Sequence, residues 1–423
     1  MKYDVIVVGG GTAGVSCAYN SAKLGLKTLI IEQNSFLGGS ITSSLVIPAM
    51  KTGNNAINTD FYDILYDKLH ELGGAITYCD GNKGWFNPEL TKIALDILMK
   101  EVDADVLYET KVIDIKKDNN KILSVCIDTI DDNNITYSDK VLLEPIGTNH
   151  LVDATGNARI FQKLNCEFLE NSCDEVQPMN LRFIMSDVDI KKFSNWLTKY
   201  DMDRNTTTCC LTEGNIYVST AYTWDKNKKW ALKPLFERAI ADGVITNDDS
   251  NYFQLFSVAG TSDSIAFNAP RLLDNSLSRS EAYKQGRLSI LRLSNFCKRF
   301  LPGFKAAYIS SIANTLGVRV SNRIKGKYIY TYDDLVSGKK FDTPVLKSNY
   351  PVDVHSCMQG HSILEHVLQD YELPIESLMS NTYKNLYAIG RCISAEFKAQ
   401  AALRIIPSCF SMGEGLAKYL AKN

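Results

Sequence analysis

The stretch VVGGGTAG, residues 7–14, decides the fold because it contains three glycines at the spacing Gly-x-Gly-x-x-Gly. These glycines are Gly9, Gly11 and Gly14. The preceding residues, 3–8, form a short apolar run rich in β-branched side chains, which predicts a buried parallel strand. A glycine-rich turn directly after such a strand is typical of a loop that binds phosphate groups.

The residues that follow complete a larger pattern. Residues 15–24 carry small and apolar side chains at helical spacing, and Gly25 is placed to end that helix. A second strand is predicted over residues 27–31 and ends at Glu32. The order strand, glycine turn, helix, strand and acid is the fingerprint of a dinucleotide-binding fold.

Each position of the fingerprint has a physical role. Gly9 permits the tight turn, Gly11 lets the backbone approach a pyrophosphate, and Gly14 lets the helix pack closely on the strand. The positive end of the helix dipole faces the phosphates, and Glu32 accepts a hydrogen bond from a ribose hydroxyl. The dinucleotide contacts expected from this segment are Gly9, Gly11, Thr12, Ala13, Gly14, Glu32 and Gln33.

Composition and charge are those of an ordinary globular chain. Its 423 residues are 45% hydrophobic and 22% charged, and the length predicts two domains or one domain with an inserted lobe. The net charge of −2 and the lack of a basic, aromatic-rich run argue against nucleic acid as a partner. Neither a membrane span nor a signal peptide is predicted. The 11 cysteines lack a disulfide-framework spacing, which predicts reduced thiols and a cytoplasmic location.

The residues after the ribose acid separate FAD from NAD. Residues 32–40 read EQNSFLGGS and resemble flavoproteins of the glutathione-reductase-like superfamily. In those proteins a Gly-Gly pair brings a second loop against the pyrophosphate and the edge of the flavin. The resemblance places Gly38 and Gly39 in that loop, with Ser40 and Thr42 beside the flavin, and implies FAD as the cofactor.

Later motifs extend the resemblance almost to the end of the chain. The chain is similar to the broad family of FAD-dependent oxidoreductases, which have a DATG-type strand near the middle and a GR-type strand before the last helix. Residues 152–158 (VDATGNA) and 386–394 (LYAIGRCIS) match these strands, although Asn157 replaces the family's usual acid. Further cofactor contacts that the resemblance implies are Val112, Ala154, Thr155, Gly156, Gly390, Arg391, Ser408 and Met412.

The second half of the chain supplies the candidate catalytic residues. It resembles the family in residues 267–271, 301–304, 316–335 and 350–355, and residues 407–420 resemble a closing helix whose N-terminus points at the flavin. Several arginines in one pocket suit a carboxylate or another anion, bound through bidentate hydrogen bonds. For the two arginines in 316–335, an ion pair or a carbonyl clamp between lobes stays open. The polar groups expected near the flavin are Arg319, Arg323, His355, Arg391 and Arg404.

The positions of the histidines and cysteines limit the acid–base, metal-binding and redox roles that the sequence predicts. His355 is the best acid–base candidate because imidazole titrates near neutrality, and a structural hydrogen-bonding role is its alternative. His361 and His366 are expected on a helix, but an HxxxxH spacing without nearby acids predicts no metal site. No pair of cysteines follows Glu32 at redox spacing, which argues against a flavin disulfide reductase. Cys409 is expected near the flavin as a packed thiol.

The predicted fold class is α/β, with a Rossmann-like FAD-binding domain and an α+β substrate lobe. The FAD-binding domain combines a parallel sheet, helices and a β-hairpin. It is predicted to be discontinuous, from residues 1–165 and 380–423, with 166–379 as the substrate-binding lobe. Other predicted elements are a helix over 88–101, a hairpin over 105–125, strands over 215–224 and 253–258, and a helix over 278–300.

The sequence therefore predicts an enzyme: an FAD-dependent dehydrogenase or reductase that transfers a hydride between the flavin and a small organic substrate. The arginines would suit an anionic substrate, and a neutral one stays open. The alternative is a flavin-binding protein whose structural or regulatory FAD acts through a protein partner. A second Gly-x-Gly-x-x-Gly is not visible, so no separate pyridine-nucleotide domain is predicted. NAD(P)H as a transient donor and a redox partner protein both stay open, as does a homodimer.

Overall fold

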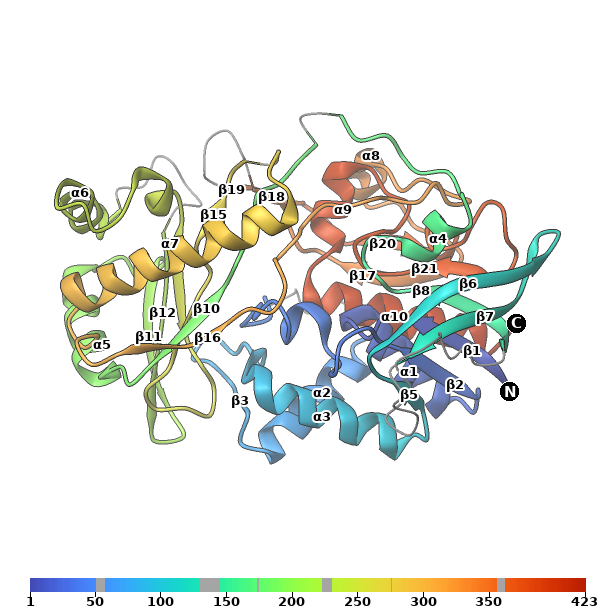
Figure 1. Cartoon of the computed structure of the whole chain (residues 1–423), viewed down its shortest axis with the longest axis horizontal. Coiled ribbons are helices and arrows are strands. Elements are labelled where there is room, and N and C mark those ends of the chain that lie inside the picture. The colour runs from blue at the N-terminus through green and yellow to red at the C-terminus, as the bar shows by residue number, and fades with distance from the viewer. Residues whose placement is uncertain (51–57, 130–144, 173–174, 223–229, 275, 356–361) are drawn as a thin grey trace, which may run out of the picture.

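The computed structural model describes residues 1–50, 58–129, 145–172, 175–222, 230–274, 276–355 and 362–423. Two large sheets occupy the two ends of the long axis of the molecule, and helices pack against both (Figure 1). Both chain termini lie at the end that contains the first sheet. A parallel-rich sheet with helices, next to antiparallel sheets, confirms the predicted α/β class.

The first sheet forms around the predicted first strand, β1. Its strand order is β5 (Asp105–Leu107), β2 (Thr28–Ile31), β1 (Lys2–Val8), β8 (Ile146–Asp153), β7 (Lys121–Thr129) and β6 (Thr110–Asp118). Strand β21 (Leu386–Ala388), from near the end of the chain, also pairs with β8 in parallel. Strands β6 and β7 form the predicted hairpin, and its turn contains Asn119 at a φ of 48°.

Four of the longer helices pack at this end of the molecule. The helices α1 (Thr12–Lys23), α3 (Pro88–Glu101) and α10 (Ile406–Leu420) confirm predicted segments, whereas no bounds were predicted for α2 (Asp60–Glu71). Helix α3 begins where predicted because the Asn87 side chain accepts hydrogen bonds from two backbone N–H groups of its first turn. Helices α1 and α10 pack so closely that a Cβ on Gly413 would lie 2.3 Å from the Ala13 carbonyl oxygen. The start of α1 is thereby packed against the middle of α10.

The second sheet is antiparallel throughout its order. That order is β11 (Thr207–Thr212), β12 (Asn215–Tyr222), β13 (Phe253–Ser257), β14 (Ile265–Phe267), β10 (Phe183–Ser186) and β16 (Tyr308–Ile312). Helix α7 (Arg279–Phe300) confirms the predicted long helix, and Ser278 caps its start. The helices α5 (Ile190–Tyr200) and α6 (Lys233–Ala241) belong to the same end of the molecule (Figure 1). The predicted strand over 215–224 is confirmed to residue 222, and its last two residues lie outside the described ones.

Shorter strands and helices complete the fold. The strand pairs are β3 (Ala75–Ile76) with β4 (Trp85–Phe86), β9 (Met179–Asn180) with β15 (Arg271–Leu272), β17 (Pro344–Ser348) with β20 (Tyr371–Pro374), and β18 (Val352–His355) with β19 (Ser362–Glu365). The short helices are η1 (Gly39–Ile41), α4 (Arg159–Lys163), η2 (Asn247–Ser250), α8 (Tyr332–Ser337), η3 (Ile375–Ser377) and α9 (Phe397–Leu403).

One sequence-based expectation is wrong in this region. His366 does not lie on a helix, because it directly follows strand β19, where pairing with β18 fixes an extended backbone. His361 lies outside the described residues. Within the described part of the chain, no group of three or more histidine, cysteine, aspartate or glutamate side chains could hold a metal ion.

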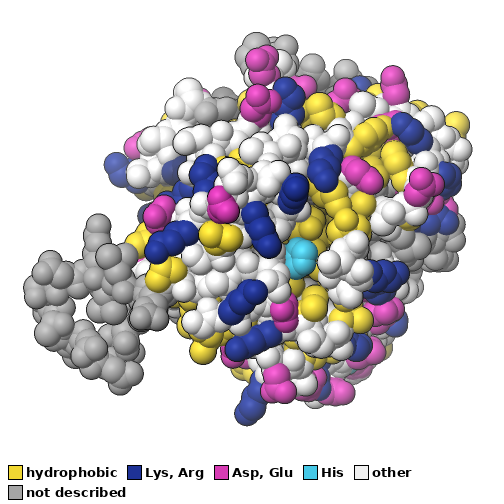
Figure 2. Space-filling model, turned by 90° about the vertical axis from the view of Figure 1, so that its right-hand side faces the viewer, with side chains coloured by type: hydrophobic (Ala, Val, Ile, Leu, Met, Phe, Trp, Pro, Cys, Tyr) yellow, Lys and Arg dark blue, Asp and Glu magenta, His cyan; other side chains and the backbone are white. Residues whose placement is uncertain are grey.

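The mixture of charges on the surface agrees with the small net charge of the sequence, and the helices agree with its lack of long apolar runs. On the face shown in Figure 2, lysine and arginine side chains are interspersed with aspartate and glutamate side chains. Among the described residues, every helix is too short or too polar to cross a membrane.

Candidate active site

A cavity of about 750 Å³, here named the central cavity, lies at the carboxyl ends of the parallel strands. Val8, Ile31, Ala154 and Ile389, which end or directly follow β1, β2, β8 and β21, all line it. Ligands of open α/β sheets bind at this edge, because loops from neighbouring strands diverge there and leave a crevice. Gln254 and other residues of the second sheet also line this cavity, so the cavity lies between the two ends of the molecule.

The glycine turn forms one end of this cavity. Gly14 packs against the turn, since a Cβ there would lie 2.0 Å from the Gly9 carbonyl oxygen. Gly11 is different: a Cβ on it would project into space with Gly39 Cα, at 4.0 Å, as its nearest neighbour. Helix α1 begins beside it with no side-chain cap, so its first backbone N–H groups remain available to an anion.

The second glycine loop packs directly against the first. Gly38 N donates to Gly10 O at 2.8 Å, and a Cβ on Gly39 would lie 2.7 Å from Gly11 Cα. The Thr42 hydroxyl donates to Leu37 O at 2.8 Å and so closes this loop. Gly38 and Thr42 therefore fix the conformation of this loop but do not line the cavity themselves.

Glu32 holds the turn and lines the cavity. Its Oε2 accepts from Gly10 N at 2.7 Å, and its Oε1 accepts from Asn34 N at 2.8 Å and from Asn34 Nδ2 at 2.7 Å. Burial raises the pKa of Glu32, and these hydrogen bonds oppose that rise. The carboxylate is thus fixed where the fingerprint places the ribose hydroxyls.

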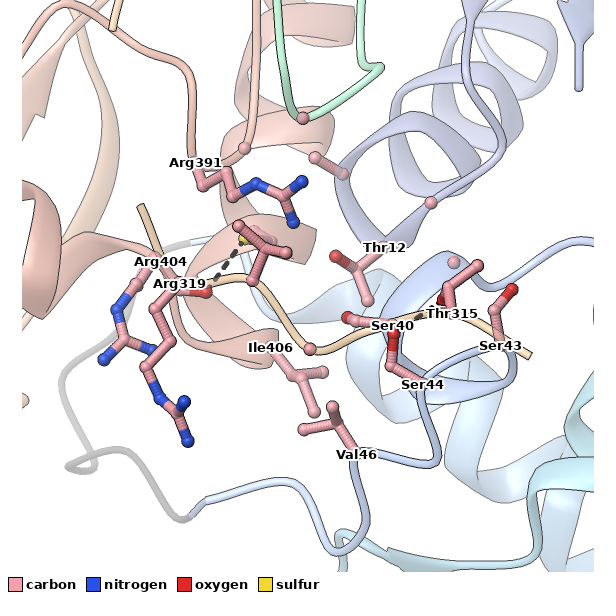
Figure 3. A pocket seen from close by; sticks show the side chains of 18 of the residues that line it. Thr12, Ser40, Ser43, Ser44, Val46, Thr315, Arg319, Arg391, Arg404 and Ile406 are labelled. Atoms are coloured by element: carbon pink, nitrogen blue, oxygen red, sulfur yellow. Dashed lines mark hydrogen bonds between the residues drawn. The ribbon is translucent and has the colours of Figure 1, made fainter. Parts of the chain in front are cut away.

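Hydroxyl groups gather on one wall of the cavity. Figure 3 shows the side chains of Thr12, Ser40, Ser43, Ser44 and Thr315 along this wall. Ser44 Oγ and Thr315 Oγ1 form a hydrogen bond of 2.8 Å. Ser43 Oγ is buried and has no hydrogen-bond partner among the described residues, so it has a donor and an acceptor left for a ligand.

Arginines gather on another wall. Arg319 and Arg404 extend in the same direction into the cavity (Figure 3), and Arg182 and Arg271 lie close enough to influence Arg319 electrostatically. Burial lowers the pKa of Arg319 well below its ordinary value, and the charges of Arg271, Arg404 and Arg182 add to this effect. Burial lowers the pKa of Arg182 to about 10, so this guanidinium stays charged at neutral pH.

A single carboxylate, that of Asp353, faces this arginine cluster among the residues that line the cavity there. Asp353 Oδ2 lies 3.6 Å from Arg404 Nη2 and 3.2 Å from His355 Nε2. Burial alone would raise the pKa of Asp353, but His355, Arg404 and Arg319 outweigh it and lower the pKa below its ordinary value. Among the described residues at this part of the cavity, four guanidinium groups face one carboxylate, so positive charge is in excess there.

The partners of His355 determine its tautomer. Arg271 Nη2 lies 2.9 Å from His355 Nδ1 and can only donate, so Nδ1 must accept and Nε2 must carry the proton. Nε2–H then donates to Asp353. Burial lowers the pKa of His355 well below its ordinary value, and the charge of Arg319 adds to this. The geometry therefore favours the structural hydrogen-bonding alternative for His355, because its lone pair is already used.

The other two candidate arginines differ in position. Arg391 lines the cavity and donates from Nη2 to Asn157 Oδ1 at 2.9 Å, so a neutral amide takes the place of the acid usual in the resemblance. Arg323 does not line the cavity. Its guanidinium donates to Asn171, Glu175 and the Ala395 carbonyl, which is the ion pair and carbonyl clamp that the sequence left open.

The structure brings most of the predicted cofactor and catalytic residues to the central cavity. Those that line it are Gly9, Gly11, Thr12, Ala13, Glu32, Gln33, Gly39, Ser40, Val112, Ala154, Thr155, Gly156, Arg319, His355, Gly390, Arg391 and Arg404. Those that do not line it are Gly14, Gly38, Thr42, Arg323, Ser408 and Met412. Ser408 and Met412 are buried inside α10, whereas Ile405, Ile406 and Cys409 at its start face the cavity.

Comparisons with known proteins decide the family. A family model described as FAD dependent oxidoreductase matches residues 4–421. The chain belongs to the FAD-dependent oxidoreductase family. It is therefore a flavoenzyme with FAD as its cofactor, and the predicted family and cofactor are confirmed.

Individual relatives of this oxidoreductase match over shorter stretches. The tRNA uridine 5-carboxymethylaminomethyl modification enzyme MnmG of Campylobacter fetus subsp. fetus (strain 82-40) is 33% identical over 161 residues, 35% of this chain and 25% of the relative. A ferredoxin–NADP reductase of Mycoplasmoides gallisepticum is 40% identical over 83 residues, 18% of this chain and 25% of the relative. The chain thus spans about a quarter of the length of each.

Among solved structures, a geranylgeranyl bacteriochlorophyll reductase-like protein from Thermoplasma acidophilum aligns with a TM-score of 0.45 and 14% identity. The alignment covers 100% of this chain and 78% of that chain.

The central cavity of the oxidoreductase fits FAD. Its volume of about 750 Å³ lies in the range of small-molecule and cofactor sites. A bound dinucleotide would use the space beside Gly11 and the buried Ser43 hydroxyl, which has no hydrogen-bond partner in the part of the chain that the structure describes. Cys409 lies at this wall as a thiol rather than a thiolate, because burial raises its pKa to about 11.

The environment of His355 predicts a pH dependence of stability. Its pKa is lowered in the fold, so below about pH 6.5 the unfolded chain takes up a proton that the folded chain does not. Stability is therefore expected to fall below pH 6.5, by up to ~1.4 kcal/mol per pH unit. Thermal melts between pH 7.5 and 5.5 should show a smaller decline for His355→Gln than for the wild type.

A second histidine variant is the control. His70 lies on α2, away from the arginine cluster, so His70→Gln should follow the wild-type decline. Equal slopes for all three proteins would show that His355 is readily protonated in the fold.

Proposed function

We propose that this oxidoreductase transfers a hydride between FAD and a small organic anion, with a carboxylate as the simplest fit. The observation that carries the proposal is a group of four guanidiniums around the carboxylate of Asp353, in which Arg271 and Arg319 are buried and Arg182 and Arg404 are half-buried. When bound, FAD supplies hydride and single-electron chemistry, while the chain supplies position and charge.

An anionic substrate would relieve an electrostatic cost that the cluster otherwise carries. Like charges and burial both lower the pKa of Arg319, which means that its charge is unfavourable without a further anion. Arg404 also has a free donor, because its Nε is buried without a partner among the described residues. A carboxylate can accept from such guanidiniums through paired hydrogen bonds.

The chain's own residues orient the substrate. Tyr252 supports Arg271, whose guanidinium carbon lies 3.5 Å from the centre of the tyrosine ring. His355 then holds Arg271 on one side and Asp353 on the other. Val46 and Ile406 are an apolar part of the cavity wall beside the hydroxyl groups (Figure 3). They exclude water, which strengthens the attraction between the arginines and an anion.

We assign FAD binding and substrate binding to the two predicted domains. Residues 1–165 and 380–423 would hold FAD through the glycine loops, Glu32 and the hydroxyl wall. Residues 166–379 would supply most of the substrate contacts, since Arg182, Tyr252, Arg271 and Arg319 come from this part. One packing contact crosses the proposed boundary, because a Cβ on Gly415 of α10 would lie 2.4 Å from the Val345 carbonyl oxygen.

An anaerobic visible spectrum of the FAD-loaded enzyme tests the proposal. Small hydroxy, amino and dicarboxylic acids are added, each beside the neutral amide of the same carbon skeleton. We expect at least one acid to bleach the flavin bands and its amide to leave them unchanged. The reverse direction is tested by reducing the flavin with dithionite and adding unsaturated acids, which should restore the bands.

Two results would count against the proposal. Amides that act as well as acids would show that the arginines do not select an anion. Flavin that remains redox-silent with every small molecule in both directions would favour the alternative, a structural or regulatory FAD that acts through a protein partner.

A further inference from the structure

A second cavity, of about 610 Å³ and here named the cationic mouth, opens beside the central cavity. Arg159 and Lys163 of α4 and Arg279 at the start of α7 line it, together with residues 320–322. Arg159, Lys163, Arg279 and Asn157 line the central cavity as well. The two spaces are therefore continuous, and one extended ligand can occupy both.

The charged residues that line the cationic mouth are all positive. Its lining residues include three cations and no acid. Among the described residues, neither Arg159 nor Arg279 has an ion-pair partner, and Lys163 Nζ donates only to the Ile113 carbonyl, at 3.0 Å. The whole chain has a net charge of −2, so this excess is local. A multiply charged anion is the ligand that such a mouth attracts.

We propose that the cationic mouth binds the phosphate groups of NADPH while its nicotinamide enters the central cavity and delivers a hydride to FAD. In this step NADPH loses a hydride and becomes NADP⁺, and FAD receives the hydride together with one proton from solvent. The inference rests on the proposed function, because it requires a redox-active FAD in the central cavity.

Three features favour this donor. The diphosphate and the 2′-phosphate of NADPH provide separate anionic groups for three separate cations, whereas NADH lacks one of them. Arg279 also acts on Arg391 of the central cavity, whose pKa is lowered by burial and further by the Arg279 charge. A site made of side chains at an opening needs no second glycine fingerprint, and the sequence has only one.

Anaerobic stopped-flow reduction of the FAD-loaded enzyme tests the inference. Flavin bleaching is measured against NADPH and NADH for the wild type, Arg279→Gln, Lys163→Gln and the double variant. We expect the Kd for NADPH to rise about tenfold for each charge removed, with an unchanged limiting rate and an unchanged Kd for FAD. The rise should be smaller for NADH and smaller at high salt.

Lys199→Gln, at the exposed end of α5 in the other half of the molecule, is the matched control and should behave as the wild type. The inference is overturned if dithionite reduces the wild-type flavin but neither nucleotide does. It is also overturned if the variants weaken FAD and leave NADPH unchanged, because the cations would then hold the diphosphate of FAD itself. Failure of the proposed function looks different, since it appears as flavin that no small acid can reduce or reoxidise.

Discussion

Replacement of Gly11 by valine is expected to abolish FAD binding and to leave the fold intact. A Cβ at this position meets no atom closer than Gly39 Cα at 4.0 Å, and Gly11 has a φ of −75°, which valine adopts without strain. The valine methyl groups would fill the space that the fingerprint reserves for a pyrophosphate. We expect the Kd for FAD to rise by about 1,000-fold, equal to ~4 kcal/mol.

The measurement is a titration of the apoprotein with FAD, followed by flavin fluorescence, with thermal melts of the apoprotein as the test of folding. Gly14→Val is the matched control, because its Cβ would lie 2.0 Å from the Gly9 carbonyl oxygen and should destabilise the apoprotein itself. If Gly11→Val binds FAD like the wild type, the phosphates do not lie beside this glycine.

Arg319→Met and Arg323→Met are expected to change stability in opposite directions. Arg319 carries a charge that burial and three neighbouring arginines disfavour, so an apolar side chain of similar length should raise the melting temperature of the substrate-free enzyme by a few degrees. The same change removes the proposed substrate contact and should lower kcat/KM on the order of 100-fold or more. Stability and activity are thus opposed at this position.

At Arg323, substitution is expected to lower stability and to leave activity unchanged. Its guanidinium is buried and bonded to Asn171, Glu175 and the Ala395 carbonyl, so methionine would leave these groups without a donor. We expect a loss of roughly 2–4 kcal/mol in the free energy of unfolding, with kcat/KM unchanged in the molecules that remain folded. Thermal melts and steady-state rates with the acid found in the flavin-bleaching experiment check both variants. A destabilised Arg319→Met would contradict the electrostatic account of the cluster.

Local sequence patterns were sufficient to predict much of the first sheet and the helices beside it. The helix over 88–101 follows from Pro88 and the Asn87 cap, and the hairpin follows from the Asp118-Asn119-Asn120 turn, because these signals act within a few residues. The expected helix at His366 failed because β-pairing between two segments overrides local preference. Arg182, Ser43 and Thr315 at the cavity wall were missed, and only their proximity in the fold marks them out.

The sequence by itself determined the dinucleotide fold, because the glycine spacing and Glu32 act over short stretches of chain, and the resemblance of residues 32–40 and of the later motifs implied FAD and the family. Only the tertiary structure decided which polar side chains line the cavity, which are buried, and which hydrogen-bond partners they have. Arg319 and Arg323 stand in one motif, yet Arg319 lines the cavity among like charges and donates to the Pro178 carbonyl, whereas Arg323 is buried among several acceptors outside the cavity. His355 similarly loses its free lone pair to Arg271, 84 residues away. Charge, protonation and access depend on which distant groups the fold brings within a few ångströms, and sequence spacing does not carry that information.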